Sequence, residues 1–171
     1  MLSLPGVVNV ESFTKLGQVV EGTVRPVDLE RLDEYLFSDD GEIHYRVTGS
    51  VSTGPDQARQ RRVRCIITGW VTLECQATLQ GLRHEIHTDS KLVLVGSESD
   101  LPPLEEESET EDFIVAPQEF DLTALVEDEI ILNLPMFPRA ENAADALSGQ
   151  AEGAADEKSP FAALAALRKP N

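Results

Sequence analysis

The sequence FDLTALVEDEIILNLPMFP, residues 120–138, predicts one short helix with well-defined ends. Asp121 is a good N-cap, because its carboxylate can accept hydrogen bonds from the free amides of the first turn. Pro135 cannot continue a helix and biases the preceding residue toward extended geometry, so we expect the helix to end near Leu134. The helix carries one apolar stripe at helical spacing, formed by Leu122, Leu125, Val126 and Ile130.

The last turn of this helix is apolar on more than one side. Ile131 and Leu132 widen the apolar surface beyond the single stripe. A helix that is apolar on most sides is normally buried from more than one direction. We therefore expect other parts of the protein to cover both residues.

Three adjacent carboxylates, Glu127, Asp128 and Glu129, lie within the same helix. Side chains at consecutive helical positions point about 100° apart, so these three do not converge on one atom as a catalytic pair or a metal site requires. Two hypotheses stay open. The carboxylates form a solvated helix face, or they hold arginine side chains from this protein's own sheet or from a partner.

Part of the helix resembles a known family. Residues 125–135, LVEDEIILNLP, closely resemble the signature of the bacterial YceD family, the large ribosomal RNA subunit accumulation proteins. Residues 71–76, VTLECQ, resemble the strand that leads into the family's cysteine motif, and residues 159–168, SPFAALAALR, resemble its closing segment. A run of this length is far more specific than a lone short motif. The resemblance extends over most of the chain from about Val19 onward.

Composition limits the class of protein. A chain of 171 residues favours one domain, and 41% hydrophobic with only 5% aromatic content predicts a core of Val, Leu and Ile. The formal net charge of −17 repels phosphate, which disfavours indiscriminate binding to nucleic acid or anionic membranes and favours basic partners. With no secretory signal, no membrane-spanning run and only two cysteines, we expect a cytoplasmic protein that does not bind membranes.

Alternating apolar and polar residues predict an antiparallel sheet. The strand candidates are residues 19–24, 42–53, 63–74, 82–88, 91–95 and 113–115. Short links between them indicate a meander. Gly69 lies in mid-strand and indicates a bulge or a tight bend, as a curved sheet or a small open barrel needs. The predicted fold is therefore α+β: a curved antiparallel sheet or small open barrel with a packed central helix at about residues 121–134.

The other segments complete the predicted domain organisation. A short amphipathic helix from Pro26 would place Leu29, Leu32 and Leu36 on one side, and residues 38–41 indicate a turn. We expect residues 1–139 to form a single YceD-like α+β domain, with residues 1–17 as a loose arm and 105–112 as a mobile acidic loop. Residues 140–158 would be a flexible acidic, Ala-rich linker. Residues 159–171 would form a short helix and tail, docked on this domain or on a partner.

The cysteines and histidines predict no metal, cofactor or catalytic site. Cys65 and Cys75 lie on one face of one predicted strand, about 33 Å apart if it is extended, so we expect buried, reduced thiols. The resemblance implies a zinc-type set, with Cys-x-x-Cys at the hairpin and a His or Cys pair beyond the helix. Here Thr78 occupies the second cysteine position, so the four ligands are not present. The three histidines, His44, His84 and His87, have no obvious nucleophile relay.

One basic cluster and one tryptophan are candidates for contact with RNA. Arg59, Arg61, Arg62 and Arg64 can grip a phosphate backbone, or they can neutralise the protein's own acidic loop. Trp70 is out of phase with the buried positions of its strand. It is therefore an exposed stacking platform or an interface anchor, unless the sheet is covered on both faces and the ring is core.

The residues alone predict an acidic, cytoplasmic, non-catalytic binding protein with no small-molecule substrate. The resemblance implies that it supports accumulation of large-subunit (23S) ribosomal RNA and biogenesis of the large subunit. Two mechanisms are open. A basic ribosomal protein or assembly factor binds at Glu127, Asp128, Glu129, Pro135 and Pro138, or precursor rRNA binds at the arginines and Trp70. The alternative function is an acidic adaptor for a basic partner unrelated to ribosome assembly.

Overall fold

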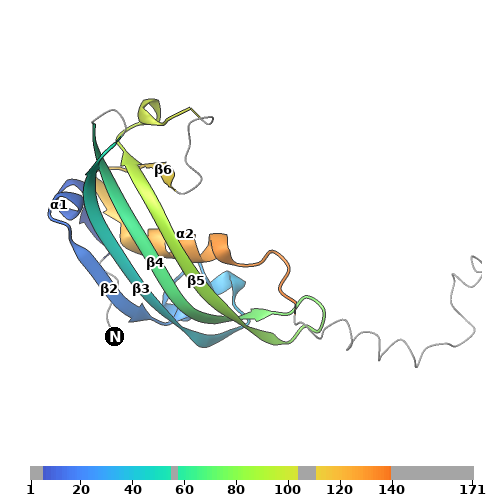
Figure 1. Ribbon diagram of the computed structural model, residues 1–171. Coiled ribbons are helices and arrows are strands. Elements are labelled where there is room, and N and C mark those ends of the chain that lie inside the picture. Colours follow the sequence, from blue (N-terminus) through green and yellow to red (C-terminus); the bar gives the residue numbers. More distant parts are fainter. Residues whose placement is uncertain (1–5, 55–57, 104–110, 140–171) are drawn as a thin grey trace, which may run out of the picture.

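A strongly curved five-stranded sheet wraps around one main helix in the computed structural model, which describes residues 6–54, 58–103 and 111–139 (Figure 1). The sheet order is β2-β3-β4-β5-β6, with β2–β5 antiparallel and β6 parallel to β5. The strands are β2 Val19–Val24, β3 Ser38–Thr53, β4 Arg59–Glu74, β5 Gly81–Val95 and β6 Asp112–Val115. The predicted α+β class with a curved sheet and a packed helix is confirmed, and the described strands form no closed barrel.

The smaller elements are short. Strands β1 Val7–Asn9 and β7 Glu119–Asp121 form a two-stranded antiparallel sheet. Helix α1 spans Val10–Lys15, and three 3₁₀ turns span Pro26–Asp28 (η1), Asp33–Tyr35 (η2) and Glu98–Asp100 (η3). Among the described residues, no helix combines the length and apolar character that crossing a membrane requires.

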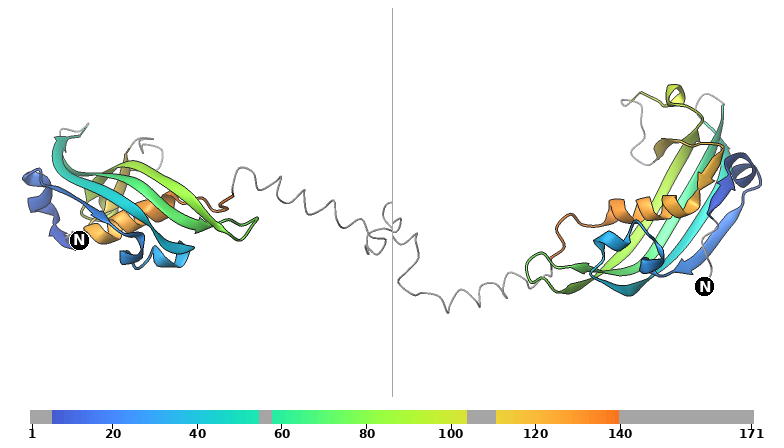
Figure 2. Two further views of the ribbon diagram at one scale, coloured as in Figure 1. Left: turned by 90° about the horizontal axis from the view of Figure 1, so that it is seen from below. Right: turned by 180° about the vertical axis from the view of Figure 1, so that it is seen from behind.

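All the main packing elements lie on the concave face of the sheet (Figure 2). Helix α2, Leu122–Asn133, covers β4 and β5, while α1 covers β3 and β4. The long strands bury alternate aliphatic residues beneath them, including Ile43, Val47, Val63, Ile67, Val71 and Ile86. No described helix covers the opposite face. The core is therefore one-sided, and this follows from the alternation of the strands.

Helix α2 has the predicted ends. The Asp121 carboxylate accepts hydrogen bonds from the amides of Thr123 (2.8 Å) and Ala124 (3.2 Å), and Leu134 after the last turn is extended. The predicted stripe of Leu122, Leu125, Val126 and Ile130 is buried. The expected burial from two directions is wrong, because the side chain of Leu132 is 81% exposed and Ile131 is only partly buried. The sheet contacts one side of the helix only.

Gly69 allows the sheet to bend. Its φ of +149° is rarely adopted by residues with a side chain, and an added Cβ would collide with the carbonyl oxygen of Glu42. The pairing is continuous through this point, with Gly69 opposite Ile43 on β3 and Ile86 on β5. Of the two predicted alternatives, the structure therefore has a bend and not a bulge.

The predicted loose arm is wrong for residues 6–17. Asn9 caps α1 by accepting a hydrogen bond from the Ser12 amide (3.0 Å), and Val10 and Phe13 are buried. Phe13 packs so closely on β3 that any side chain at Gly49 would clash with it. The segment is too short to show a helical period, although its capping and burial fix it to the domain.

Three other local predictions are corrected. The helix expected from Pro26 is replaced by the turns η1 and η2, although Leu29 and Leu32 are buried as predicted. Residues 38–41 belong to β3, where a shift in register replaces the expected turn. Residues 82–95 form one continuous strand, because residues 89 and 90 stay paired with β4. The division at residues 139 and 158 stays a prediction, since 140–171 and most of the acidic loop lie outside the described residues.

Replacing Gly69 with alanine should strongly destabilise the protein. The Cβ would meet the backbone of β3 in a conformation that already disfavours side chains, so we expect the free energy of unfolding to fall by about 2–5 kcal/mol. Urea denaturation measures this. Gly96→Ala is the control, because the nearest atom to a Cβ there is 3.8 Å away and little should change. Equal stability of the two variants would contradict the role of Gly69.

Candidate functional site

The carboxylates of α2 bind other parts of the same chain. Glu127 is only 5% exposed, and its Oε1 accepts a hydrogen bond from the backbone amide of Arg31 at 3.0 Å. The carboxylate of Asp128 pairs with the Arg31 guanidinium at 2.5 Å. The carboxylate of Glu129 accepts a hydrogen bond from the Ser90 hydroxyl on β5. The solvated-face hypothesis therefore fails at Glu127, and the arginine that is held lies between η1 and η2, outside the sheet.

A cleft opens where α2 ends, and we call it the post-helix cleft. It has a volume of about 340 Å³ and is lined by Glu34, Tyr35, Leu36, Leu73, Glu74, Gln76, Leu134, Pro135, Met136 and Pro138. The carbonyl of Pro138 accepts a hydrogen bond from the Gln76 amide (2.9 Å), which ties this segment to the β4–β5 hairpin. Beside the cleft, Met136 is 88% and Phe137 75% exposed. Pro135 and Pro138 thus border an apolar surface with carboxylates next to it.

The hairpin between β4 and β5 closes through its backbone. The amide of Leu79 donates to the Cys75 carbonyl at 2.8 Å, and the Cys75 amide donates to the Gln80 carbonyl at 2.9 Å. The described residues bring no three of His, Cys, Asp and Glu together as a metal site. With Thr78 in place of a second cysteine, this hairpin does not fit the zinc arrangement that the family resemblance implies.

Both cysteines are buried thiols outside any disulfide. Burial raises the pKa of the Cys65 thiol to about 12, and the negative charge of Glu129 contributes to the increase. A thiol with so high a pKa carries almost no thiolate at neutral pH and is a poor nucleophile.

The four clustered arginines point to two faces of the sheet, because side chains alternate along a strand. On the convex face, Arg62 pairs with Glu111 at 2.6 Å and Arg64 pairs with Asp89 at 2.6 Å. The hydrogen bonds from Arg64 hold the pKa of Asp89 below its usual range. These two arginines are neutralised within the chain.

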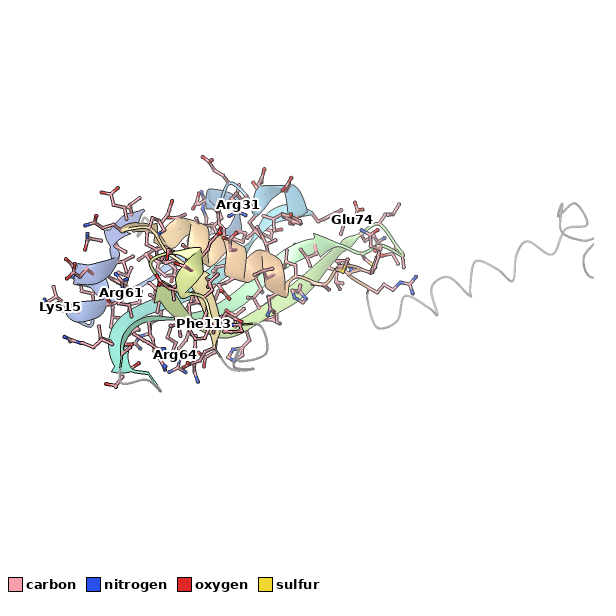
Figure 3. All side chains as sticks on the ribbon, turned by 90° about the horizontal axis from the view of Figure 1, so that it is seen from above. Lys15, Arg31, Arg61, Arg64, Glu74 and Phe113 are labelled. Carbon is pink, nitrogen blue, oxygen red and sulfur yellow. The ribbon has the colours of Figure 1, made fainter. Side chains whose placement is uncertain are left out.

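Arg59 and Arg61 have the opposite orientation and line a second cleft, of about 320 Å³, which we call the basic cleft. Its remaining lining residues are Glu11, Thr14, Lys15 and Val51. Within the described part of the chain, neither arginine forms an ion pair. The sequence pattern did not identify Lys15 of α1 as a site residue, because it lies in a segment whose apolar residues have no regular spacing. Figure 3 shows Lys15 and Arg61 together at one end of the sheet, with Glu74 at the other.

Trp70 lies on the open convex face and is half-buried. The Arg83 guanidinium lies 4.0 Å from the centre of its ring, and Arg83 also pairs with Glu85 at 2.6 Å. Because no helix in the described part of the chain covers this face, Trp70 is not a core residue. It lies six positions from Arg64, about 20 Å along the strand, so the structure does not bring the tryptophan and the arginines together.

The histidines do not form one site. His44 contacts Glu42 (2.6 Å) and Thr23 (2.9 Å) on the convex face, where His87 also lies. His84 points to the concave face, and its Nε2 is buried without a hydrogen-bond partner. They therefore offer no common metal or proton-transfer site.

The sequence matches one family model, described as large ribosomal RNA subunit accumulation protein YceD, over residues 63–168. This is more than half of the chain. The match includes α2, the β4–β5 hairpin and the post-helix cleft's proline-rich segment. It does not include Lys15, Arg59 or Arg61. No solved structure matches the chain.

Removing the Glu127 carboxylate should cost more stability than removing Asp128. Glu127→Ala leaves the partly buried amide of Arg31 without its acceptor, so we expect a loss of about 1–3 kcal/mol in the free energy of unfolding. Asp128→Ala removes a half-exposed ion pair and should cost less than about 1 kcal/mol. Urea denaturation of both variants measures the difference. A larger loss for Asp128→Ala would contradict the structural role of Glu127.

Neither thiol should react in the folded protein. At pH 8 we expect Ellman's reagent to modify no cysteine within minutes, because both side chains are buried. After unfolding in guanidinium chloride, both cysteines of the chain should react at the rate of a free thiol such as glutathione. Rapid reaction of the folded protein would show that the hairpin or the sheet opens.

Proposed function

Because the chain belongs to the YceD family, we propose that it supports accumulation of large-subunit (23S) ribosomal RNA and thereby biogenesis of the large ribosomal subunit. It acts in the bacterial cytoplasm by binding ribosomal components and catalyses no reaction. The contacts of α2 support a binding role, since Glu127 and Glu129 are committed to hydrogen bonds within the fold.

The single observation that carries the binding mode is the apolar surface at the post-helix cleft. Isolated apolar residues on a protein surface are common, whereas a contiguous group is typical of an interaction site. Here the highly exposed Met136 and Phe137 follow Pro135 directly, and Met136 lines the cleft. The chain is held on both sides of them, because the Pro138 carbonyl accepts a hydrogen bond from the hairpin and Leu134 packs against the core.

The partner that fits this surface is a basic ribosomal protein or assembly factor. Two exposed carboxylates, Glu34 and Glu74, line the cleft, and residues 92–138 contain no Lys, Arg or His. A basic segment with apolar side chains can place those side chains in the cleft and its charges beside the carboxylates. The binding residues are then Pro135 and Pro138 with their exposed neighbours, while Glu127, Asp128 and Glu129 position the helix that presents them.

An acidic adaptor for a basic partner unrelated to ribosomes would use the same surface. The two functions differ in what the cell loses when the protein is absent. Only a ribosomal role predicts a change in the balance of the two subunit rRNAs.

Deleting this protein from its cell should lower the ratio of large- to small-subunit rRNA, and the wild-type chain should restore it. Met136→Ser/Phe137→Ser should restore it poorly, because the variant lacks the apolar anchors of the proposed interface. Quantitative RNA electrophoresis measures the ratio.

The matched control is Leu16→Ser/Val19→Thr, which removes two exposed apolar residues far from the cleft and should restore the ratio fully. Thermal unfolding checks that each variant is folded. An unchanged ratio after deletion would rule out the ribosomal function and leave the adaptor function. Full rescue by Met136→Ser/Phe137→Ser would place the interface elsewhere.

A further inference from the structure

The basic cleft gathers cations that form no ion pair with any carboxylate in the described part of the chain. Most described cations are paired: Arg25, Arg31, Arg46, Arg62, Arg64 and Arg83 each lie within 4.0 Å of a carboxylate. Among the described residues, the remaining cations are Lys15, Arg59, Arg61, Lys91 and Arg139. Three of these five line one cleft. Their segregation is notable in a chain with a net charge of −17, where carboxylates greatly outnumber cations.

The surroundings of the cleft leave it positive. Among the described residues that line it, Glu11 is the only carboxylate, against three cations. The Thr14 hydroxyl is used locally, because it donates a hydrogen bond to the Val10 carbonyl at 2.8 Å. Like charges held side by side repel each other, and an anion in the cleft would relieve that repulsion.

We propose that Lys15, Arg59 and Arg61 form a binding site for the phosphates of single-stranded RNA. Guanidinium groups match the geometry of phosphate oxygens, and a lysine adds a point charge. Arg59 and Arg61 are alternate residues of one strand, so their side chains leave the same face about 6.6 Å apart. Two donors in a row beside an open cleft suit successive phosphates of a polymer better than one small anion.

This site deepens the proposed function, on which it rests for the identity of the polymer as ribosomal RNA. Of the five residues that the sequence suggested for contact with RNA, this site keeps only Arg59 and Arg61. Arg62 and Arg64 are neutralised on the other face of the sheet, and Trp70 is covered by Arg83. The basic cleft lies at the α1 end of the sheet, opposite the end that carries Glu74 and the post-helix cleft (Figure 3). RNA and a basic protein can therefore occupy the same molecule together.

The test is fluorescence anisotropy of a labelled 12-nucleotide single-stranded oligouridine with the full chain. For three phosphate contacts, affinity should fall about twentyfold between 50 mM and 200 mM salt. Arg59→Gln/Arg61→Gln should weaken binding at 50 mM salt by about tenfold or more and flatten the salt dependence to about threefold. Lys15→Gln, on a different element, should also weaken binding and reduce the salt slope.

The matched control is Arg62→Gln/Arg64→Gln, which removes the same charge from the opposite face and should change affinity less than about twofold, since both arginines are already paired. Equal weakening by the two double variants would show a general charge effect and overturn the site. A wild-type chain that does not bind oligouridine would also overturn the site. The same holds if polyglutamate or duplex RNA binds with the same affinity as oligouridine. Circular dichroism confirms folding. An unchanged rRNA ratio after deletion would contradict the proposed cellular function. It would not affect the test of the cleft, which depends on the anisotropy measurements alone.

Discussion

The structure depends on one buried face: α2, together with the short α1, occupies the concave side of a sheet whose convex side is covered by no described helix. Several residues hold α2 in this position. Gly69 bends the sheet around it, Asp121 and Pro135 set its ends, and Glu127 connects it to the chain segment at Arg31. A carboxylate that is 5% exposed is costly unless it is bonded, so the segment at Arg31 and the helix stabilise each other. Disruption of that contact would loosen the post-helix segment as well.

The open convex face explains how four of the described arginines, Arg46, Arg62, Arg64 and Arg83, are used. Along β3, β4 and β5 its side chains form pairs such as Arg64 with Asp89 and Arg83 with Glu85. Paired charges of both signs keep an uncovered sheet face solvated without giving it a net field. The two interaction surfaces that we propose lie at the two ends of the sheet, away from these paired charges.

The sequence allowed the prediction of elements with strong local signals. The helix ends follow from Asp121 and Pro135, and the long strands follow from their alternation, because both signals are local. Helix α1 was not predictable, since a six-residue helix is stabilised by packing of Phe13 on β3 and has no period of its own. The exposure of Leu132 and the parallel pairing of β6 depend on tertiary arrangement. For the candidate sites, the sequence showed which residue types were present. It did not show that, among the described residues, Arg62 and Arg64 form ion pairs whereas Arg59 and Arg61 do not, because those ion pairs depend on how the strands are paired.

The two ends of the sheet also resolve an apparent conflict between charge and function. A net charge of −17 opposes phosphate binding, yet the family is named for ribosomal RNA accumulation. Long-range repulsion is screened beyond about 8 Å at physiological salt, whereas short-range contacts within a cleft are screened less. The proposed binding of RNA by a local group of three cations is therefore compatible with a surface that repels phosphate elsewhere. This combination favours contact at one defined place over coating of RNA, and it leaves the acidic end of the molecule to the basic proteins that RNA would otherwise attract.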